Sequence, residues 1–296
     1  MDQEAYPSDT RSSSKARAYY ELTKPGIAGY VMVTAGVSAF VGARGDLALT
    51  VALHTMIGTG LATAGALSLN QYVEREADAV MHRTRSRPIP TERVAPMEAL
   101  GFGAVLLMTG LVYLALALGA LPALLTAASG LMYHLVYTPL KTRSYVATLA
   151  GALPGALPML IGWTAATGTV DAGGLAMFAI GYLWQLPHVL GLAWMLREDY
   201  ARVGFVLIPR GGARSIGMQM VLSTALLLPV SWIPGLLGYL GPVYLGGAAI
   251  FGLAFLGTAI AAAREMSDER ARTVFFSSLL YHPLLLGLML VDIVLL

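Results

Sequence analysis

The sequence predicts an all-α integral membrane protein with about nine transmembrane helices, because its composition is apolar, long apolar segments recur, and its basic residues gather on one side. Of the 296 residues, 56% are hydrophobic and 12% are charged. The mean hydropathy is +0.67. Soluble domains carry about 25% charged residues. We therefore expect a lipid bilayer to be the main solvent of this chain.

Charge and cysteine content exclude several kinds of function. The net charge is +2, and the basic residues are dispersed among short loops. No stretch combines a basic patch with a stacking surface, so we do not expect nucleic-acid binding. The chain has no cysteine, which excludes disulfides, thiolate metal sites and cysteine nucleophiles. Any metal must be held by oxygen or imidazole.

The N-terminal segment 1–20 is expected to be a solvated tail, followed by a single transmembrane domain over 21–296. The tail has no apolar core of the kind that a signal peptide needs. Its charged residues are Asp2, Glu4, Asp9, Arg11, Lys15 and Arg17.

Nine apolar segments are long enough to cross a membrane, which takes about 20 residues of helix. Prolines at 154, 158 and 187 fall inside these segments, where neighbouring helices satisfy the freed backbone groups or the helix kinks. The expected spans are 26–43, 48–69, 98–118, 120–137, 146–167, 174–195, 216–237, 240–263 and 274–296.

The basic residues give an independent test of this topology. With nine spans, the N-terminal tail and every second loop lie on one side, and all 19 lysines and arginines except Arg44 fall there. Cytoplasmic loops collect positive charge. We therefore expect a multi-pass protein of the cell (plasma or inner) membrane, with a cytoplasmic N-terminus and cytoplasmic acidic loops and with the C-terminus outside.

Two long loops lie on the positive side. The first acidic loop covers 70–93 and the second covers 195–214, and they follow the second and the sixth span. This spacing suggests two four-helix units in tandem plus a final helix.

The first acidic loop carries oxygen ligands at regular spacing. Asn70, Glu74 and Asp78 are four residues apart, so they share one face if the second helix continues beyond the membrane surface. Magnesium is usually bound by one or two carboxylates together with substrate phosphates. The arginines that follow, at 83, 85 and 87, are forked donors suited to phosphate oxygens. The combination indicates a diphosphate site.

The alternative for this loop is an ordinary solvated segment, with arginines that set topology and acids that pair with them. The second loop favours the diphosphate site, because it places a similar group at the corresponding end of the second unit. Two acidic sites facing each other across a bundle could hold two metals on one diphosphate. The group comprises Arg197, Glu198, Asp199, Tyr200 and Arg202.

Four histidines fall inside expected spans: His54, His134, His188 and His282. Ionisable residues at membrane depth are candidates for function. For each single histidine the alternative is a hydrogen bond between helices. A porphyrin iron accepts imidazole, and His188 is the preferred candidate because Trp184 and Pro187 beside it could form a flat, bent pocket wall.

The run 70–88 has the form N-x-x-x-E-R-x-x-D-x-x-M-x-R-T-x-x-R-P. It resembles the signature of the protoheme IX farnesyltransferases (haem O synthases), a branch of the UbiA superfamily of intramembrane prenyltransferases. Departures from the family pattern occur at Ala147, Met159 and His282. Further blocks keep family order at 21–25, 137–141, 155–163, 183–188, 197–204 and 208–209.

The resemblance implies transfer of a farnesyl group from farnesyl diphosphate to a vinyl group of haem b, with addition of water, to give haem O and diphosphate. It also suggests haem A synthase as a partner. The implied catalytic residues are Asn70, Glu74, Asp78 and Asp199, with Mg²⁺ held by these four and Glu198. The diphosphate would be bound by Arg83, Arg87, Lys141 and Arg197, and haem by Trp184 and His188.

Two other functions remain open at this point. One is a UbiA-type transfer to a quinone precursor or to another tetrapyrrole. The second is membrane transport, for which tandem repeats and intramembrane histidines are also expected. Against transport, the carboxylates cluster at one membrane face and not near the midplane.

Overall fold

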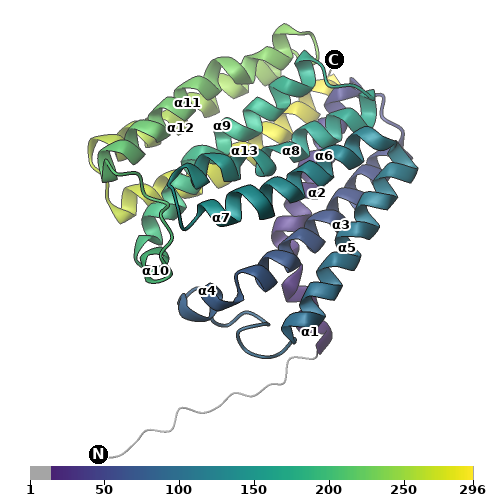
Figure 1. The fold of residues 1–296 in the computed structure, drawn as a ribbon. Coiled ribbons are helices and arrows are strands. Elements are labelled where there is room, and N and C mark those ends of the chain that lie inside the picture. The colour runs from purple at the N-terminus through teal and green to yellow at the C-terminus, as the bar shows by residue number, and fades with distance from the viewer. Residues whose placement is uncertain (1–14, 296) are drawn as a thin grey trace, which may run out of the picture.

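A computed structural model describes residues 15–295 as a bundle of long helices (Figure 1). No strand occurs within that range. Nine of its helical segments are long and apolar enough to cross a membrane. The predicted fold class and number of spans are therefore confirmed. The spans are α2 (Pro25–Gly42), α3 (Leu49–Val73), α5 (Pro96–Leu118), a composite fourth span (Ala120–Leu140), α8 (Val146–Thr167), α9 (Ala172–Met195), α11 (Gly212–Leu236), α12 (Pro242–Arg264) and α13 (Asp268–Leu295).

The fourth span changes its helical type before it ends. It consists of α6 (Ala120–Leu131), the π-helical segment η1 (Met132–Tyr137) and α7 (Thr138–Leu140). A π-helical segment shifts the direction of the side chains that follow it, and such segments are frequent at functional sites. Here the π-helical segment ends about one turn before Lys141.

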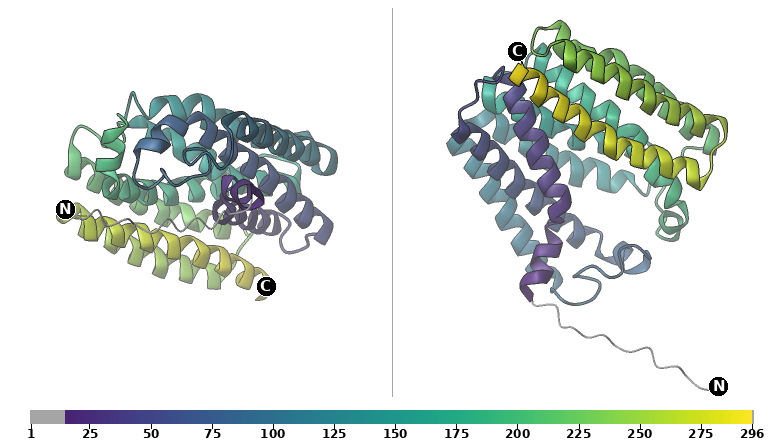
Figure 2. Two further views of the ribbon diagram at one scale, coloured as in Figure 1. Left: turned by 90° about the horizontal axis from the view of Figure 1, so that it is seen from below. Right: turned by 180° about the vertical axis from the view of Figure 1, so that it is seen from behind.

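The first four spans contact one another in chain order, and so do the next four. Helix α8 also contacts α2 and α6, and α13 contacts α12, α9 and α2, which joins the two groups. Figure 2 shows the yellow α13 alongside the green helices α11 and α12. This arrangement agrees with two four-helix units and a final helix.

Prolines inside α8 are accommodated without a break in the helix. Pro158 has no N–H to give to the carbonyl of Pro154, one turn earlier. The hydroxyl of Ser129 on α6 donates to that carbonyl at 3.0 Å. A neighbouring helix therefore satisfies the freed acceptor, as membrane burial requires.

Glycines allow α3 and α5 to pack with their backbones close together. A Cβ at Gly65 would lie 2.3 Å from the backbone nitrogen of Leu107, and one at Gly110 would lie 2.4 Å from that of Ala62. Side chains at these positions would force the helices apart. Such close approach is typical of helix packing in lipid.

Part of the expected solvated tail is helical and packed. Helix α1 (Lys15–Leu22) has Ala18 and Leu22 on one face, and both are fully buried. They share an apolar cluster with Ile89 of the first acidic loop and with Val94, which follows that loop. Lys15, Ala16, Arg17 and Tyr20 on the other faces of this helix are exposed, and residues 1–14 of the expected tail lie outside the described range.

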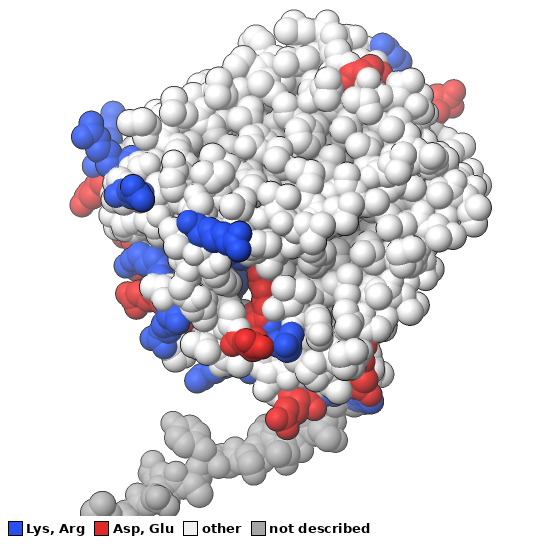
Figure 3. Space-filling model, in the orientation of Figure 1, with Lys and Arg blue, Asp and Glu red and all other residues white. Residues whose placement is uncertain are grey.

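Charged side chains gather along the left edge and the lower end of the molecule in Figure 3, with a small group at the upper right, and the broad surface between these groups is uncharged. Large apolar side chains are exposed on the spans, among them Leu116, Leu236 and Val294. Such a surface is suited to lipid. Helices α1, α4 (Arg75–Val80) and α10 (Arg197–Arg202) all lie toward the charged end, away from the end of α13 (Figure 1).

Candidate functional site

The regular spacing of the first acidic motif survives in the structure, although the helix is interrupted within it. Helix α3 ends at Val73, and Glu74 joins it to α4. The backbone N–H of Glu74 donates to Asn70, and that of Asp78 donates to Glu74. All three residues are buried, with exposed fractions of 2% for Asn70, 8% for Glu74 and 0% for Asp78.

Glu74 is held by two polar neighbours. The amide of Asn70 donates to one carboxylate oxygen at 3.0 Å, and the ammonium of Lys141 donates to the other. Burial raises the pKa of Glu74, but the charge and hydrogen bonds of Lys141 and Asn70 outweigh burial and hold the pKa below its ordinary value. Glu74 is therefore an anion at neutral pH.

Asp78 is paired with a residue of its own loop. The Arg87 guanidinium donates to both carboxylate oxygens, at 2.7 and 2.6 Å. The hydroxyl of Thr84 fixes the turn by donating to the backbone carbonyl of Asp78 at 2.9 Å. The two buried carboxylates of the motif thus each contact a cation that the sequence assigns to diphosphate.

Lys24 is a further cation at this site, and the sequence prediction missed it. It comes directly before α2 with a left-handed backbone, φ 46°. Burial, together with repulsion by Arg87 and Lys141, lowers the pKa of Lys24 to about 7 against the attraction of Glu74 and Asp78. The available signal was a lysine before the proline that begins the first span.

The second acidic loop meets the first through Asp199 on α10. Its carboxylate accepts hydrogen bonds from the backbone N–H groups of His82 at 3.3 Å and Arg83 at 3.2 Å. Arg202 also contacts the His82 ring at 2.6 Å. Burial raises the pKa of Asp199, but the N–H groups of Arg83 and His82 outweigh it and lower the pKa. Asp199 therefore joins the second acidic loop to the first, and its role in metal binding stays a prediction.

Other predicted site residues are placed differently. Arg197 donates to Asp268 at the start of α13, at 2.5 Å, and to the backbone of Trp194 at 2.8 Å. The side chains of Glu198 and Arg83 are exposed. The structure does not bring these three into contact with the buried carboxylates, and their assigned roles stay predictions.

The chemistry of the buried motif fits a divalent cation shared with a substrate. The side-chain oxygen of Asn70 is buried without a hydrogen-bond partner among residues 15–295. Within that range no three histidine, aspartate or glutamate side chains cluster closely enough to hold a metal alone. A hard cation would therefore complete its shell with phosphate oxygens and water, which is the usual mode for magnesium.

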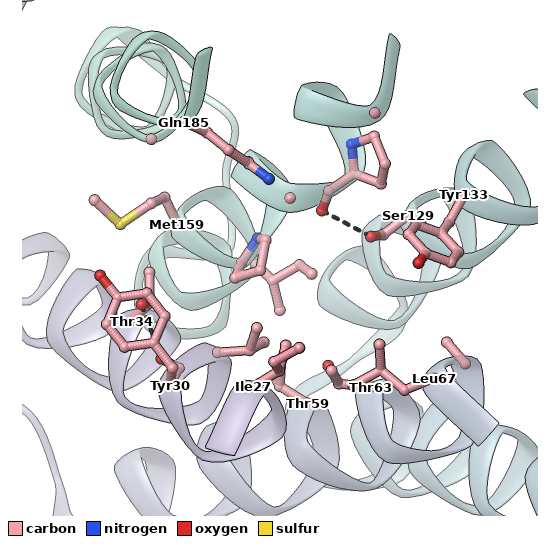
Figure 4. Close-up of a pocket in the computed structure, with 18 of the residues that line it drawn as sticks. Ile27, Tyr30, Thr34, Thr59, Thr63, Leu67, Ser129, Tyr133, Met159 and Gln185 are labelled. Carbon is pink, nitrogen blue, oxygen red and sulfur yellow. Dashed lines mark hydrogen bonds between the residues drawn. The ribbon is translucent and has the colours of Figure 1, made fainter. Parts of the chain in front are cut away.

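A cavity of about 550 Å³ lies between the helices (Figure 4). Its lining is mostly apolar and comes from both helical units and α13. Gly26 and Leu67 line it, and each lies within one helical turn of a polar site residue, Lys24 and Asn70 respectively. The cavity therefore begins beside the charged site and extends among the spans.

Trp184 and His188 form one wall of this cavity. The indole N–H of Trp184 donates to the Ser278 backbone at 2.7 Å, and the Ser278 hydroxyl lies 2.9 Å from Nδ1 of His188. The Trp184 and His188 rings are stacked at 5.8 Å, and His188 is stacked on Phe275 at 4.6 Å. Helix α13 thus fixes a flat aromatic wall.

Residues 31–280 match the profile of the UbiA prenyltransferase family. The chain belongs to this family. It is 42% identical over 287 residues to a protoheme IX farnesyltransferase of Solibacter usitatus (strain Ellin6076), covering 93% of this chain and 98% of that protein. It is 38% identical to a protoheme IX farnesyltransferase of Aquifex aeolicus (strain VF5), covering 94% and 96%.

Solved structures share the UbiA fold at lower identity. One is a digeranylgeranylglyceryl phosphate synthase, with a TM-score of 0.81, 18% identity and coverage of 95% of this chain and 99% of that chain. A second is a UbiA homologue from Archaeoglobus fulgidus bound to GPP and Mg²⁺, with a TM-score of 0.65, 13% identity and coverage of 94% and 99%.

These relationships confirm the resemblance seen in the motifs and identify a membrane prenyltransferase. The transporter alternative is therefore set aside. His54 does not line the cavity. Its Nδ1 lies 2.7 Å from the Tyr113 hydroxyl, which is the helix-to-helix hydrogen bond expected as the alternative for an intramembrane histidine.

Proposed function

We propose that this protein transfers the farnesyl group of farnesyl diphosphate to a vinyl group of haem b, with addition of water, to give haem O and diphosphate. The observation that carries the proposal is the apolar cavity, whose lining residues Gly26 and Leu67 lie within one helical turn of Lys24 and Asn70 of the charged site. The protoheme IX farnesyltransferase relatives indicate the donor and the acceptor.

Farnesyl diphosphate has an apolar end and a charged end, and the site likewise has an apolar cavity and a group of charged residues. A farnesyl chain is as apolar as lipid and fits between the helices, whereas the diphosphate needs charged partners. Lys24, Arg87 and Lys141 supply positive charge where the cavity begins. Binding diphosphate between them replaces part of their pairing with the carboxylates.

These cations also act on the reaction itself. When the allylic C–O bond breaks, negative charge accumulates on the departing diphosphate, and fixed positive groups in a dry site stabilise that charge strongly. We assign this role to Arg87 and Lys141, with Arg83 and Arg197 joining from the loop surfaces. The apolar cavity keeps water from the allylic cation until the vinyl group attacks it.

Magnesium is the proposed metal, because the Archaeoglobus fulgidus homologue was solved with GPP and Mg²⁺ bound. Asn70, Glu74 and Asp78 would hold it, with Asp199 and Glu198 contributing from α10. Bound there, it would neutralise charge on the diphosphate oxygens. The unpartnered oxygen of Asn70 supports this assignment. The low pKa of Glu74 supports it too, because a ligand carboxylate must be ionised.

We place the acceptor, haem b, against the cavity wall formed by Trp184 and His188. Flat aromatic rings suit a porphyrin face, and an imidazole can bind its iron.

We also propose that the acidic loops face the cytoplasm with the C-terminus outside. A haem A synthase is the proposed recipient of the product, and co-purification from the native membrane would test that partner.

The decisive experiment incubates the purified protein with haem b, farnesyl diphosphate and magnesium, and analyses the extracted haem by chromatography and mass spectrometry. We expect a later-eluting haem that is heavier by one farnesyl group and one water. Chelation of magnesium should abolish it. Unchanged haem with intact magnesium-dependent donor binding would assign another acceptor, such as a quinone precursor or another tetrapyrrole.

Three variants sharpen that experiment. Glu74→Gln and Asp78→Asn should abolish turnover in a folded protein, because each removes a buried charge from the motif. Glu76→Gln is the matched control, since Glu76 lies on the same short helix with its side chain 88% exposed. Wild-type activity in Glu74→Gln or Asp78→Asn would remove the metal-site assignment.

A further inference from the structure

Three residues that line the largely apolar cavity carry a buried polar side-chain atom without a hydrogen-bond partner in the described part of the chain. These atoms are Oγ1 of Thr59, Oε1 of Gln185 and Nε2 of His282. His282 is only 1% exposed. A buried polar atom without a partner costs free energy, so each is a candidate contact for a molecule that enters the cavity.

The orientation of His282 is set by contacts from two other helices. Its Nδ1 is hydrogen-bonded to the hydroxyl of Tyr30 on α2. Its ring is stacked on Trp184 of α9 at 4.1 Å, with 18° between the planes. These contacts leave Nε2 as the free nitrogen. When Nδ1–H donates to Tyr30, Nε2 is a hydrogen-bond acceptor.

Gln185 contributes the second acceptor, and the chain makes room for it. Its side chain points into the cavity (Figure 4). It lies against Gly155 of α8, where a Cβ would come within 2.2 Å of Oε1. Two hydrogen-bond acceptors suit a water molecule, because water has two protons to donate. Water occupies an otherwise apolar cavity only where polar groups can form hydrogen bonds with it.

We propose that His282 accepts the proton of the water that is added during haem O formation, with Tyr30 as its positioning residue. This inference rests on the proposed function. The allylic C–O bond breaks and the electron pair leaves with diphosphate. The vinyl π electrons then form the new C–C bond, which leaves a cation at the carbon next to the porphyrin.

Water completes the reaction at that carbon. Its oxygen forms the C–O bond, and one of its protons passes to Nε2 of His282. The proton later leaves to solvent, so that haem b, farnesyl diphosphate and water give haem O, diphosphate and one proton. Without a positioned acceptor, the cation would instead lose a carbon-bound proton and give a farnesylated haem that lacks the added water.

The test compares products and does not rely on total activity alone. His282→Phe keeps a flat ring to stack on Trp184 but removes both nitrogens. Tyr30→Phe keeps His282 but removes the group that orients it. His54→Phe is the matched control, because His54 is also paired with a tyrosine inside a span but does not line the cavity. Each variant is purified in detergent and assayed with haem b, farnesyl diphosphate and magnesium.

We expect the ratio of hydroxylated to anhydrous farnesyl haem to fall by roughly tenfold or more in His282→Phe, somewhat less than typical general-base effects because the cation is reactive. Tyr30→Phe should lower the ratio by a smaller factor, and His54→Phe should leave it unchanged. Labelled oxygen from water should enter the hydroxylated product only.

Two results would overturn the inference while the proposed function stands. One is a wild-type product ratio in folded His282→Phe. The second is complete loss of both farnesyl transfer and haem binding in folded His282→Phe. That result would mean that His282 binds haem b and does not take the proton of the water. If His282→Phe does not fold, an unchanged ratio in Tyr30→Phe overturns it. If the wild-type protein makes no farnesylated haem at all, the proposed function fails instead.

Discussion

The ammonium of Lys141 donates to the carboxylate of Glu74 across a separation of 67 residues. The pair joins the end of the fourth span to the end of the second, and each side chain is only 8% exposed. Tyr137 shields it further, because its ring lies 4.4 Å from the ammonium. Substrate binding at this site must therefore compete with an existing buried ion pair.

Lys141→Met should lower the stability of the substrate-free protein. It leaves the Glu74 carboxylate buried without its cation, and removal of one partner of a buried pair costs about 3–5 kcal/mol. The apparent midpoint of thermal unfolding in detergent measures the change. Turnover should be lost as well, since the same ammonium is assigned to the diphosphate.

The double variant Glu74→Gln/Lys141→Met provides the control for that prediction. It removes both charges, so much of the lost stability should return although activity stays absent. If the double variant were as unstable as Lys141→Met, the cost would come from packing and not from the unpaired carboxylate.

The spacing of Asn70, Glu74 and Asp78 could be predicted from the sequence, because it depends on a single helical period. The partner of Glu74 could not, because it depends on how two spans cross and on the π-helical segment that precedes Lys141. Arg87 was assigned to phosphate from its residue type alone. Its contact with Asp78 depends on the fold of the loop between them, which residue type does not reveal.

Asp199→Asn should loosen the contact between the two acidic loops. A carboxylate that accepts two backbone N–H groups is a stronger acceptor than an amide, whose NH₂ group cannot accept. We expect faster amide hydrogen exchange over 82–87 and lower turnover. Glu198→Gln is the matched control, because Glu198 neighbours Asp199 but is exposed. Equal exchange in both variants would argue against Asp199 as the link.

Lys24 should make diphosphate affinity dependent on pH. With its pKa lowered to about 7, Lys24 is protonated below pH 7 and loses its proton as the pH rises through that value. A bound diphosphate favours the charged form, so binding above pH 7 requires proton uptake. Affinity should then fall by up to roughly tenfold per pH unit above 7.

Lys24→Arg separates this effect from the ionisation of the diphosphate itself. An arginine stays protonated throughout this range, so the variant should show a flatter pH dependence than the wild type. Calorimetry in buffers of different ionisation enthalpy measures the proton uptake directly. Identical pH profiles in both proteins would place Lys24 outside the diphosphate site.

The packing of α1 against the first acidic loop could not be predicted from the sequence for a related reason. Lys15 and Arg17 dominate the character of the first segment, and the apolar face of Ala18 and Leu22 is too short to stand out by itself. Its meaning depends on Ile89, which is distant in sequence. Short local patterns were decisive only where the membrane imposed a length on them, as it did for the spans.

Ser129→Ala should destabilise the protein although Ser129 carries no charge. The hydroxyl satisfies the carbonyl of Pro154, which Pro158 leaves without its helical partner. Loss of such a hydrogen bond inside a membrane costs about 1 kcal/mol, which should appear as a lower thermal midpoint. Pro158→Ala restores an N–H within α8, so the double variant Ser129→Ala/Pro158→Ala should lose less than the sum of the two single changes. Strict additivity would mean that the carbonyl finds another donor, and the contact between α6 and α8 would then be one of packing alone.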